Sequence, residues 1–238
     1  MTLTATETET ISITQIRQGS VEVKDDTLVV EKDVSIELGG NVLLRTTCSP
    51  GHLYEWVIGY LFSEGLIRRI DDVKAVRKNR GVFSVELATL LPLPSSPPPP
   101  VESDLALSTE RLLAAAREVT QRATIFDATG GTHAMAIIDR TGIVSFAEDI
   151  SRTCALEKAI GDALLRDVAL KDSFAFLSSR VPTRLLSKVG RCGIPILGAI
   201  SAPTFDALQL ADRLGICLCG FVRGDRLNVY SHGWRVGL

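Results

Sequence analysis

Hydrophobic and polar residues alternate along the first part of the chain. The segment from Ile11 to Thr47 reads ISITQIRQGSVEVKDDTLVVEKDVSIELGGNVLLRTT, with apolar residues at many second positions. This period is typical of β-strands that turn one face toward a core. Turn-forming residues interrupt the run at 18–19, 24–26 and 39–41. The pattern therefore predicts short antiparallel strands joined by tight turns.

One helix is expected among these strands. Ser49 and Pro50 fit an N-cap and a first-turn residue, and apolar residues then recur at three- and four-residue steps from Leu53 to Leu61. Gly65 is well placed to end this helix. A hairpin is predicted next, over residues 72–87, because Asn-Arg-Gly at its centre suits a tight turn.

Strands and helices alternate in the second half. Ser108 is expected to cap a helix that includes residues 111–122, and HAMAIID and IVSFAED form a second hairpin. Helices are predicted at 154–168, 183–191 and 204–214, and strands at 174–177, 195–200, 216–222 and 226–230. Short apolar strands separated by helices indicate a layered α/β sheet.

A proline-rich segment separates the two patterns. It reads LPLPSSPPPPVESD, and its four consecutive prolines offer no backbone N–H and hold φ near about −65°. The segment is therefore expected to be an extended strut or an exposed loop. The sequence predicts a β-rich N-terminal domain with one helix over 1–90, a proline-rich linker or loop over 91–104, and an α/β domain over 105–238.

Composition excludes several classes of protein. With 45% hydrophobic and 23% charged residues, the chain is expected to be globular. A net charge of −2 and no basic run interleaved with aromatics argue against nucleic-acid binding. The first 14 residues lack the positive start and apolar core of a signal peptide, and no apolar run approaches the ~20 residues of a membrane span. We therefore expect a cytoplasmic protein that is not in the membrane, whose five scattered cysteines are free thiols.

Polar residues gather where the predicted strands of the second half end. Four segments combine a strand end or a small-residue turn with the start of a helix or strand: DATGGTHAM (127–135), EDISRTCALEK (148–158), FLSSRVP (176–182) and ISAPTFDA (200–207). Strand ends of an α/β sheet lie at one edge, and helix starts present free N–H groups there. These segments predict a site for phosphate or another anion.

Each residue in these segments also fits a structural role. Gly130 and Gly131 would suit a hairpin, and His133 would suit a half-buried ring with satisfied hydrogen bonds. Arg152, Arg180 and Lys188 are equally compatible with structural ion pairs. Their shared location at strand ends favours the functional interpretation.

A zinc site is not predicted. A zinc-dependent deaminase needs a His-x-Glu element and a later Pro-Cys-x-x-Cys. The corresponding positions here are His133, Ala134 and Met135, and the chain contains no Cys-x-x-Cys. Cys217 and Cys219 lie two apart in an apolar strand, where packing is the simpler role.

Six segments in series resemble one known family. CSPGHLYEWVIGYLFSEGLI, FDATGGTHAMAI, EDISRTCALEKAIGDALL, LSSRV, GIPILGAISAPTFDALQLA and GFVRGDRLNVY are similar, in order and spacing, to the formate dehydrogenase accessory sulfurtransferases of the FdhD/NarQ family. The resemblance spans residues 11–230.

The resemblance implies a fold and a function. It implies a cytidine-deaminase-like α/β domain without zinc, preceded by a small β-rich domain, in a cytoplasmic homodimer. Members accept sulfur from a cysteine desulfurase and pass it to the molybdenum cofactor of formate dehydrogenase. This cofactor is a molybdopterin guanine dinucleotide, and members bind it through its guanine nucleotide ends. Carried over, the residues that bind cofactor or guanine nucleotide are Gly130, Gly131, His133, Arg152, Lys158, Arg180, Ser201, Ala202, Pro203, Thr204, Phe221 and Arg223.

The chain departs from the family at the sulfur carrier. The family places Ser-Ser-Cys-Gly-x-Cys-Gly before the central helix, whereas this chain has Ser95 and Ser96 followed by four prolines. Sulfur relay needs an accessible thiolate, which proline lacks. Cys154, expected in a first helical turn beside Arg152, is a candidate substitute carrier, and Cys48 is a weaker one. Cys154 also fits a small packing residue.

Three functions are therefore compatible with the sequence. The first is an accessory sulfurtransferase for formate dehydrogenase maturation. The second is a non-catalytic chaperone or scaffold that keeps the cofactor or nucleotide pocket and has lost the chemistry. The third is a nucleoside-processing hydrolase, which the missing zinc ligands disfavour.

Overall fold

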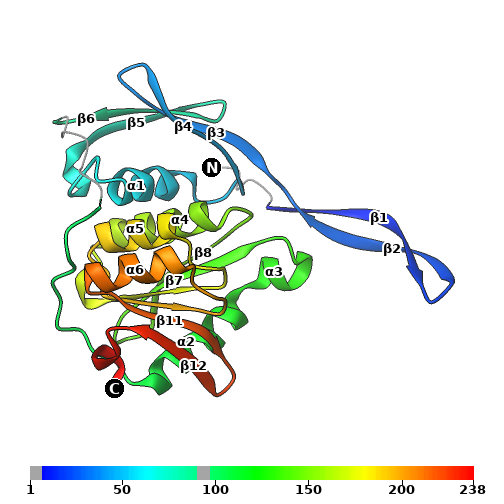
Figure 1. Cartoon of the computed structure of the whole chain (residues 1–238). Helices are drawn as coiled ribbons and strands as arrows, with labels where there is room; N and C mark the ends of the chain where they lie inside the picture. Colours follow the sequence, from blue (N-terminus) through cyan, green and yellow to red (C-terminus); the bar gives the residue numbers. More distant parts are fainter. Residues whose placement is uncertain (1–6, 90–96) are drawn as a thin grey trace.

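Three sheets and their covering helices make up the structure, a computed structural model that describes residues 7–89 and 97–238. A four-stranded sheet lies on one helix, a layer of three helices follows, then a six-stranded sheet and two further helices (Figure 1). A two-stranded ribbon projects from this body (Figure 1). The mixed α/β class predicted from the sequence is confirmed.

The projecting ribbon consists of β1 (Thr8–Arg17) and β2 (Ser20–Val29). The strands are antiparallel, and Gln18 and Gly19 form the turn with φ of 48° and 85°. The turn predicted at 24–26 is wrong, because these residues lie within β2 and pair with Ile13, Ser12 and Ile11. Both faces of most of the ribbon are exposed to water. The strand therefore continues through its charged residues, which would interrupt a strand that packs one face on a core.

The four-stranded sheet has the order β4-β3-β6-β5. Its strands are β3 (Lys32–Leu38), β4 (Asn41–Cys48), β5 (Val73–Asn79) and β6 (Val82–Leu87). The predicted hairpin at 72–87 is confirmed, but β3 and β6 pair in parallel, so the N-terminal strands do not form one antiparallel sheet. Helix α1 (Leu53–Ser63) covers the inner face, where Trp56 packs edge-on against Phe83 at 6.0 Å between ring centroids.

Helix α1 begins later than predicted. Its N-cap is His52, which has a left-handed backbone with φ of 53°, and not Ser49. Ser49 instead makes contacts far along the chain: its N–H donates to Asp149 Oδ2 and its hydroxyl accepts from the Ile150 N–H. The helix ends at Glu64, and Gly65 follows with φ of 77°, as the sequence predicts.

The six-stranded sheet has the order β12-β11-β10-β9-β7-β8. Its strands are β7 (His133–Ile138), β8 (Ile143–Asp149), β9 (Phe174–Leu177), β10 (Ile196–Ala199), β11 (Cys217–Arg223) and β12 (Arg226–Ser231). The three strands β9, β10 and β11 are parallel, and the outer strands run antiparallel to their neighbours. This arrangement confirms the alternating pattern predicted for the second half.

Helices cover both faces of this sheet. The helices α4 (Arg152–Leu165), α5 (Thr183–Arg191) and α6 (Phe205–Leu214) lie on one face, and α2 (Thr109–Arg122) and α3 (Thr124–Thr129) lie on the other (Figure 1). Ser108 caps α2 by accepting from the Arg111 N–H. The short helix α3 was not predicted. No helix in the described ranges is long and apolar enough to cross a bilayer.

The four-stranded sheet and the six-stranded sheet meet through α1 and α4. A Cβ added at Gly59 would lie 1.7 Å from the Glu157 carbonyl oxygen, and one at Gly161 would lie 1.8 Å from the Glu55 carbonyl oxygen. The two helices therefore touch backbone to backbone. The proposed boundary stays a prediction, and residues 91–96 of the predicted linker lie outside the described residues.

The described end of the proline segment is anchored to the body. Pro98 is buried, and the Val101 N–H donates to the Leu214 carbonyl oxygen at 2.8 Å. The Ser103 hydroxyl donates to the Lys171 carbonyl oxygen at 2.7 Å. From Pro97 onward the segment is therefore packed along the α/β part.

Candidate functional site

Several strand ends of the six-stranded sheet meet at one pocket. Strand β7 runs antiparallel to β8 and β9, so its first residue, His133, lies opposite Asp149 at the end of β8 and close to the end of β9, where Leu177 pairs with Met135. Strand β10 ends at Ala199 at the same edge, and Ile200 and Ser201 follow it. The pocket has a volume of about 660 Å³. Its lining residues are His133, Ile150, Ser151, Arg152, Thr153, Ser178, Ser179, Arg180 and Ser201.

Backbone and hydroxyl groups hold the strand ends together. The Ala134 N–H donates to Ser178 Oγ and the Ser178 N–H donates to the Ala134 carbonyl oxygen, both at 2.9 Å. This pair continues the β7–β9 ladder by one step. His133 and the loop that carries Arg180 are thereby held on one wall of the pocket.

The start of α4 forms another wall. Ser151 caps the helix by accepting from the Cys154 N–H, and Arg152 and Thr153 occupy the first turn. The free N–H groups of a helix start carry a partial positive charge. This end of α4 therefore adds to the positive potential of the pocket.

The pocket is cationic. Arg152 and Arg180 line it, no carboxylate lines it, and within residues 7–89 and 97–238 neither arginine forms an ion pair. Partial burial lowers the pKa of His133, and the Arg152 guanidinium lowers it further, while Asp149 opposes the shift. His133 is therefore neutral near pH 7. The pocket offers two charges, a helix start and several hydroxyls to an anion.

A buried ion pair supports the pocket from below. Lys158 Nζ lies 2.6 Å from Asp149 Oδ2 and donates to the Ser49 carbonyl oxygen at 2.8 Å. Asp149 also accepts from the Ser151 N–H at 2.7 Å, which fixes the start of α4. Burial raises the pKa of Asp149, and the Lys158 ammonium opposes that shift. Lys158, predicted to bind cofactor, is therefore placed under the pocket and does not line it.

Glu148 organises the approach to His133. Its carboxylate accepts from the N–H groups of Ile125 and Phe126 at 3.0 and 2.8 Å, and from the Thr132 hydroxyl at 2.9 Å. It therefore caps the start of α3 and fixes the residue before His133. Sequence analysis missed Glu148 and Asp149 as anchors, although two acids at a strand end followed by a capping serine are a usable signal.

The predicted glycines lie outside the pocket lining. Gly130 ends α3 with φ of 66°, and Gly131 lies against Val29 of the ribbon, because its added Cβ would be 3.0 Å from a Val29 methyl group. Both are exposed. They shape the turn that leads into β7.

The turn after β10 contributes one residue to the pocket, Ser201. The next residues are structural in this arrangement: the Ala202 carbonyl oxygen accepts from the Val181 N–H, Pro203 forms a β-bridge with Val181, and Thr204 caps α6. Ala202, Pro203 and Thr204, all predicted to bind cofactor, therefore lie next to the pocket and do not line it.

The two predicted residues of β11 are also outside the lining. The Phe221 N–H donates to the Ser201 carbonyl oxygen at 3.3 Å, so Phe221 supports the Ser201 turn. Arg223 Nε donates to the Ile200 carbonyl oxygen at 2.8 Å, and its side chain lines a separate hollow of about 410 Å³ beside α2. The pocket thus brings together His133, Arg152, Arg180 and Ser201 from the predicted set.

The candidate sulfur carriers are buried. Cys154 is 2% exposed and belongs to the core under the four-stranded sheet, as does Cys48. The hydrogen bond between the Cys48 thiol and Cys154, together with burial, raises the pKa of Cys48. Of the two roles that the sequence allows for Cys154, its burial fits the packing residue, because the side chain lies in the core under the four-stranded sheet. All five cysteines are free and buried.

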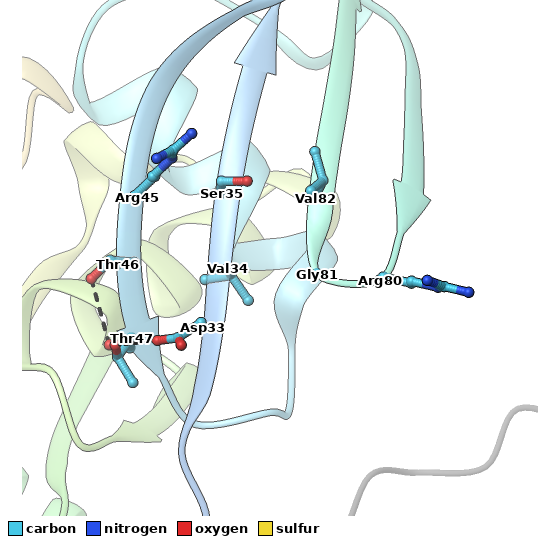
Figure 2. Close-up of a pocket in the computed structure, with 9 residues that line it drawn as sticks. All are labelled: Asp33, Val34, Ser35, Arg45, Thr46, Thr47, Arg80, Gly81 and Val82. Carbon is cyan, nitrogen blue, oxygen red and sulfur yellow. Dashed lines mark hydrogen bonds between the residues drawn. The ribbon is translucent and has the colours of Figure 1, made fainter.

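A different hollow lies on the outer face of the four-stranded sheet. Figure 2 shows its residues on β3, β4 and the β5–β6 turn, with the Arg80 side chain directed away from the others. Its volume is about 500 Å³, and its Asp33 carboxylate already accepts from the Thr47 hydroxyl at 2.7 Å. In the part of the chain that the structure describes, no three His, Cys, Asp or Glu side chains are grouped to hold a metal ion.

Comparisons with known proteins agree on one family. The FdhD/NarQ family matches residues 29–96 and 89–237. The sulfur carrier protein FdhD of Methanothermobacter thermautotrophicus is 32% identical over 226 residues, which cover 88% of this chain and 91% of that protein. The sulfur carrier protein FdhD of Geobacillus kaustophilus is also 32% identical, and the match covers 94% of this chain and 95% of that protein. A crystal structure of a putative formate dehydrogenase accessory protein from Desulfotalea psychrophila has a TM-score of 0.84 at 24% identity and covers 97% of this chain and 100% of that one.

Proposed function

Because the chain belongs to the FdhD/NarQ family, we propose that it serves formate dehydrogenase maturation by binding the guanine nucleotide ends of molybdopterin guanine dinucleotide. The observation that supports this most is the pocket lined by His133, Arg152, Arg180 and Ser201. Two arginines without carboxylate partners, a helix start and serine hydroxyls suit the phosphates of a nucleotide.

Two roles remain for such a pocket, and burial of the thiols favours one. A family sulfurtransferase would take persulfide sulfur from a cysteine desulfurase and present it to the cofactor. That role needs a thiol that reaches two partners, whereas all five cysteines of this chain are buried. We therefore favour a cofactor or guanine-nucleotide chaperone for formate dehydrogenase that has no thiol shuttle of its own.

Binding of GDP tests the pocket. Calorimetry with wild type and Arg180→Ala should show binding by wild type and a loss of about 1–3 kcal/mol in the variant, the scale of a charged hydrogen bond. Arg122→Ala is the matched control, because Arg122 is the exposed last residue of α2 and does not line the pocket. Equal binding by wild type and Arg180→Ala would remove Arg180 from the site.

Persulfide labelling separates the two roles. The protein is incubated with a cysteine desulfurase and ³⁵S-cysteine, and bound label is then located by mass spectrometry. The chaperone role predicts no label on any cysteine. Label on Cys154 or Cys48 would establish a sulfurtransferase and would require that the core around them opens.

We propose further that the protein acts in the cytoplasm as a homodimer and that its α/β part has the cytidine-deaminase-like fold. The ribbon supports the dimer. A two-stranded ribbon is marginally stable alone, and neither of its edges pairs with another strand of the described residues. Ile16, Val21 and Val23 share one face of its tip and are exposed, so a second copy of the same face would cover them.

A further inference from the structure

A groove between α1, α5 and α6 carries a second concentration of positive charge. Its volume is about 590 Å³, and it shares no lining residue with the nucleotide pocket at the strand ends. The lining includes the last residues of α1, one side of α5 and the last two turns of α6. The residues are Ser63, Glu64, Pro97, Thr183, Arg184, Ser187, Lys188, Arg191, Leu210 and Arg213.

The charges of this groove are not balanced within the described chain. Lys188 is buried, and it lies 2.6 Å from Glu64 and 2.9 Å from Glu157, so its charge is already compensated. Glu64 is the single carboxylate in the lining, and its distance of 3.9 Å from Arg184 is long for an ion pair. Arg191 and Arg213 form no ion pair within the described residues.

The spacing of the arginines suits a chain of charges better than one small anion. Arg184 and Arg191 are seven residues apart on α5, about two turns, so their backbones are separated by about 10.5 Å along the axis. An extended peptide advances about 10 Å in three residues. Carboxylates about three residues apart on an extended segment therefore match the spacing of these two arginines along α5.

Hydroxyl groups lie between the charged positions. Ser187 is exposed in part on the same side of α5 as Arg184 and Arg191, and Thr183 lies at the start of the helix. Hydroxyls accept from and donate to the backbone of an extended segment. Arginine pairs with carboxylates through two parallel hydrogen bonds, which gives such a segment a defined position.

We propose that this groove is a docking site for an acidic, extended peptide segment of a protein partner. The site is separate from the nucleotide pocket and does not depend on what that pocket binds. Arg184, Arg191 and Arg213 are the contact residues, and the ligand class is a segment with carboxylates about three residues apart.

Fluorescence anisotropy tests the site with a labelled peptide, (Asp-Ser-Gly)₄, against the same peptide with Asn for Asp. The wild-type protein should bind the Asp peptide and not the Asn peptide, and added salt should weaken binding. The double variant Arg191→Gln/Arg213→Gln should bind at least tenfold more weakly. Arg122→Gln on α2 should bind like wild type, and thermal unfolding of each variant checks the fold.

Three results would overturn the proposal. The first is equal affinity of the double variant and wild type for the Asp peptide. The second is equal affinity of wild type for the Asp and Asn peptides. The third is displacement of the peptide by inorganic tripolyphosphate at or below the peptide's own concentration, which would make the groove a small-anion site. Because thermal unfolding reports the fold, loss of binding in a folded variant counts for the proposal.

Discussion

His133 is the residue whose protonation reports most directly on the pocket proposed to bind a nucleotide. It is half-buried, its pKa is lowered by burial and by Arg152, and it lines the cavity. A neutral imidazole both donates and accepts, so it can hydrogen-bond to a phosphate or to a base without adding charge. An anion in the pocket would favour the imidazolium and shift the same equilibrium in the opposite direction.

The pKa of His133 should therefore rise when GDP binds. NMR titration of the ring protons, assigned with His133→Gln, measures this pKa. Arg152→Gln should raise the pKa of His133 in the free protein, because a positive neighbour is removed. The folded-state pKa lies below the usual 6.5. The unfolded chain thus binds more protons between the two values, and this group makes stability fall as pH falls from about 6.5 through the folded pKa.

If the His133 ring titrates at the same pH with and without bound GDP, the nucleotide binds elsewhere. His52 serves as the internal control. It is exposed and does not line the pocket, and the hydrogen bond to Glu55 raises its pKa. Its titration should change little on binding.

Sequence alone found half of the pocket because one rule of topology applies to it. Strand ends of an α/β sheet share an edge, so His133, Arg180 and Ser201 were predicted together from three separate segments. Lys158 does not line the pocket, because the direction of a helical side chain depends on packing. It lies six residues after Arg152, about 240° around the helix, and α1 covers that side.

At the scale of elements, the contact between α1 and α4 fixes the relation of the two sheets. Glycines at 59 and 161 let the helices meet without side chains between them. Beside this contact, Trp56 Nε1 donates to Glu157 Oε2 at 2.8 Å, and Glu157 pairs with Lys188 of α5. A buried polar network of this kind tolerates little displacement.

Gly59→Ala should therefore destabilise the protein strongly. The added methyl would lie 1.7 Å from the Glu157 carbonyl oxygen, so α1 and α4 must separate and the network around Glu157 must shift. We expect a loss of about 3 kcal/mol or more in denaturant unfolding, in the range of the larger overpacking effects.

Gly233→Ala is the matched control for this substitution. The added methyl there would be 3.2 Å from Leu238 Cβ, an exposed terminal side chain that can move. A change within about 0.5 kcal/mol is expected for it. If Gly59→Ala is as mild as Gly233→Ala, the close approach of the two helices does not exist in solution.

Elements with a strong period were predicted, and elements set by tertiary contacts were not. The helix at 183–191 and the strand at 174–177 match the structure residue for residue, because their apolar faces pack on a core. Helix α3 is one and a half turns long and its first N–H groups are capped by Glu148 from a distant strand, so no local pattern marks it. The parallel pairing of β3 with β6 likewise depends on contacts between distant segments.

At the scale of the whole molecule, the ribbon stands apart from the three cores. Its base is held by the bond from the Val30 N–H to the Glu7 carbonyl oxygen at 2.9 Å and by Val29 against Gly131. The tip lacks such support, since Ile16 is 73% and Val23 is 75% exposed. Exposed apolar side chains on a free sheet edge mark an interaction surface.

If the proposed dimer forms through the ribbon tip, the triple variant Ile16→Thr/Val21→Thr/Val23→Thr should keep the fold and be monomeric. Threonine suits a strand, and the three replaced side chains contribute nothing to a core of the single chain. The unfolding free energy per protomer should therefore change by no more than about 0.5 kcal/mol, measured under conditions where wild type is monomeric. Light scattering after gel filtration should give the mass of a monomer at concentrations where wild type gives that of a dimer.

Ile36→Thr, in the buried core of the four-stranded sheet, is the contrasting control and should lower stability while the dimer of the folded fraction persists. A triple variant that remains dimeric would assign the interface to another surface, because three hydroxyls on the tip would disrupt any apolar contact made there.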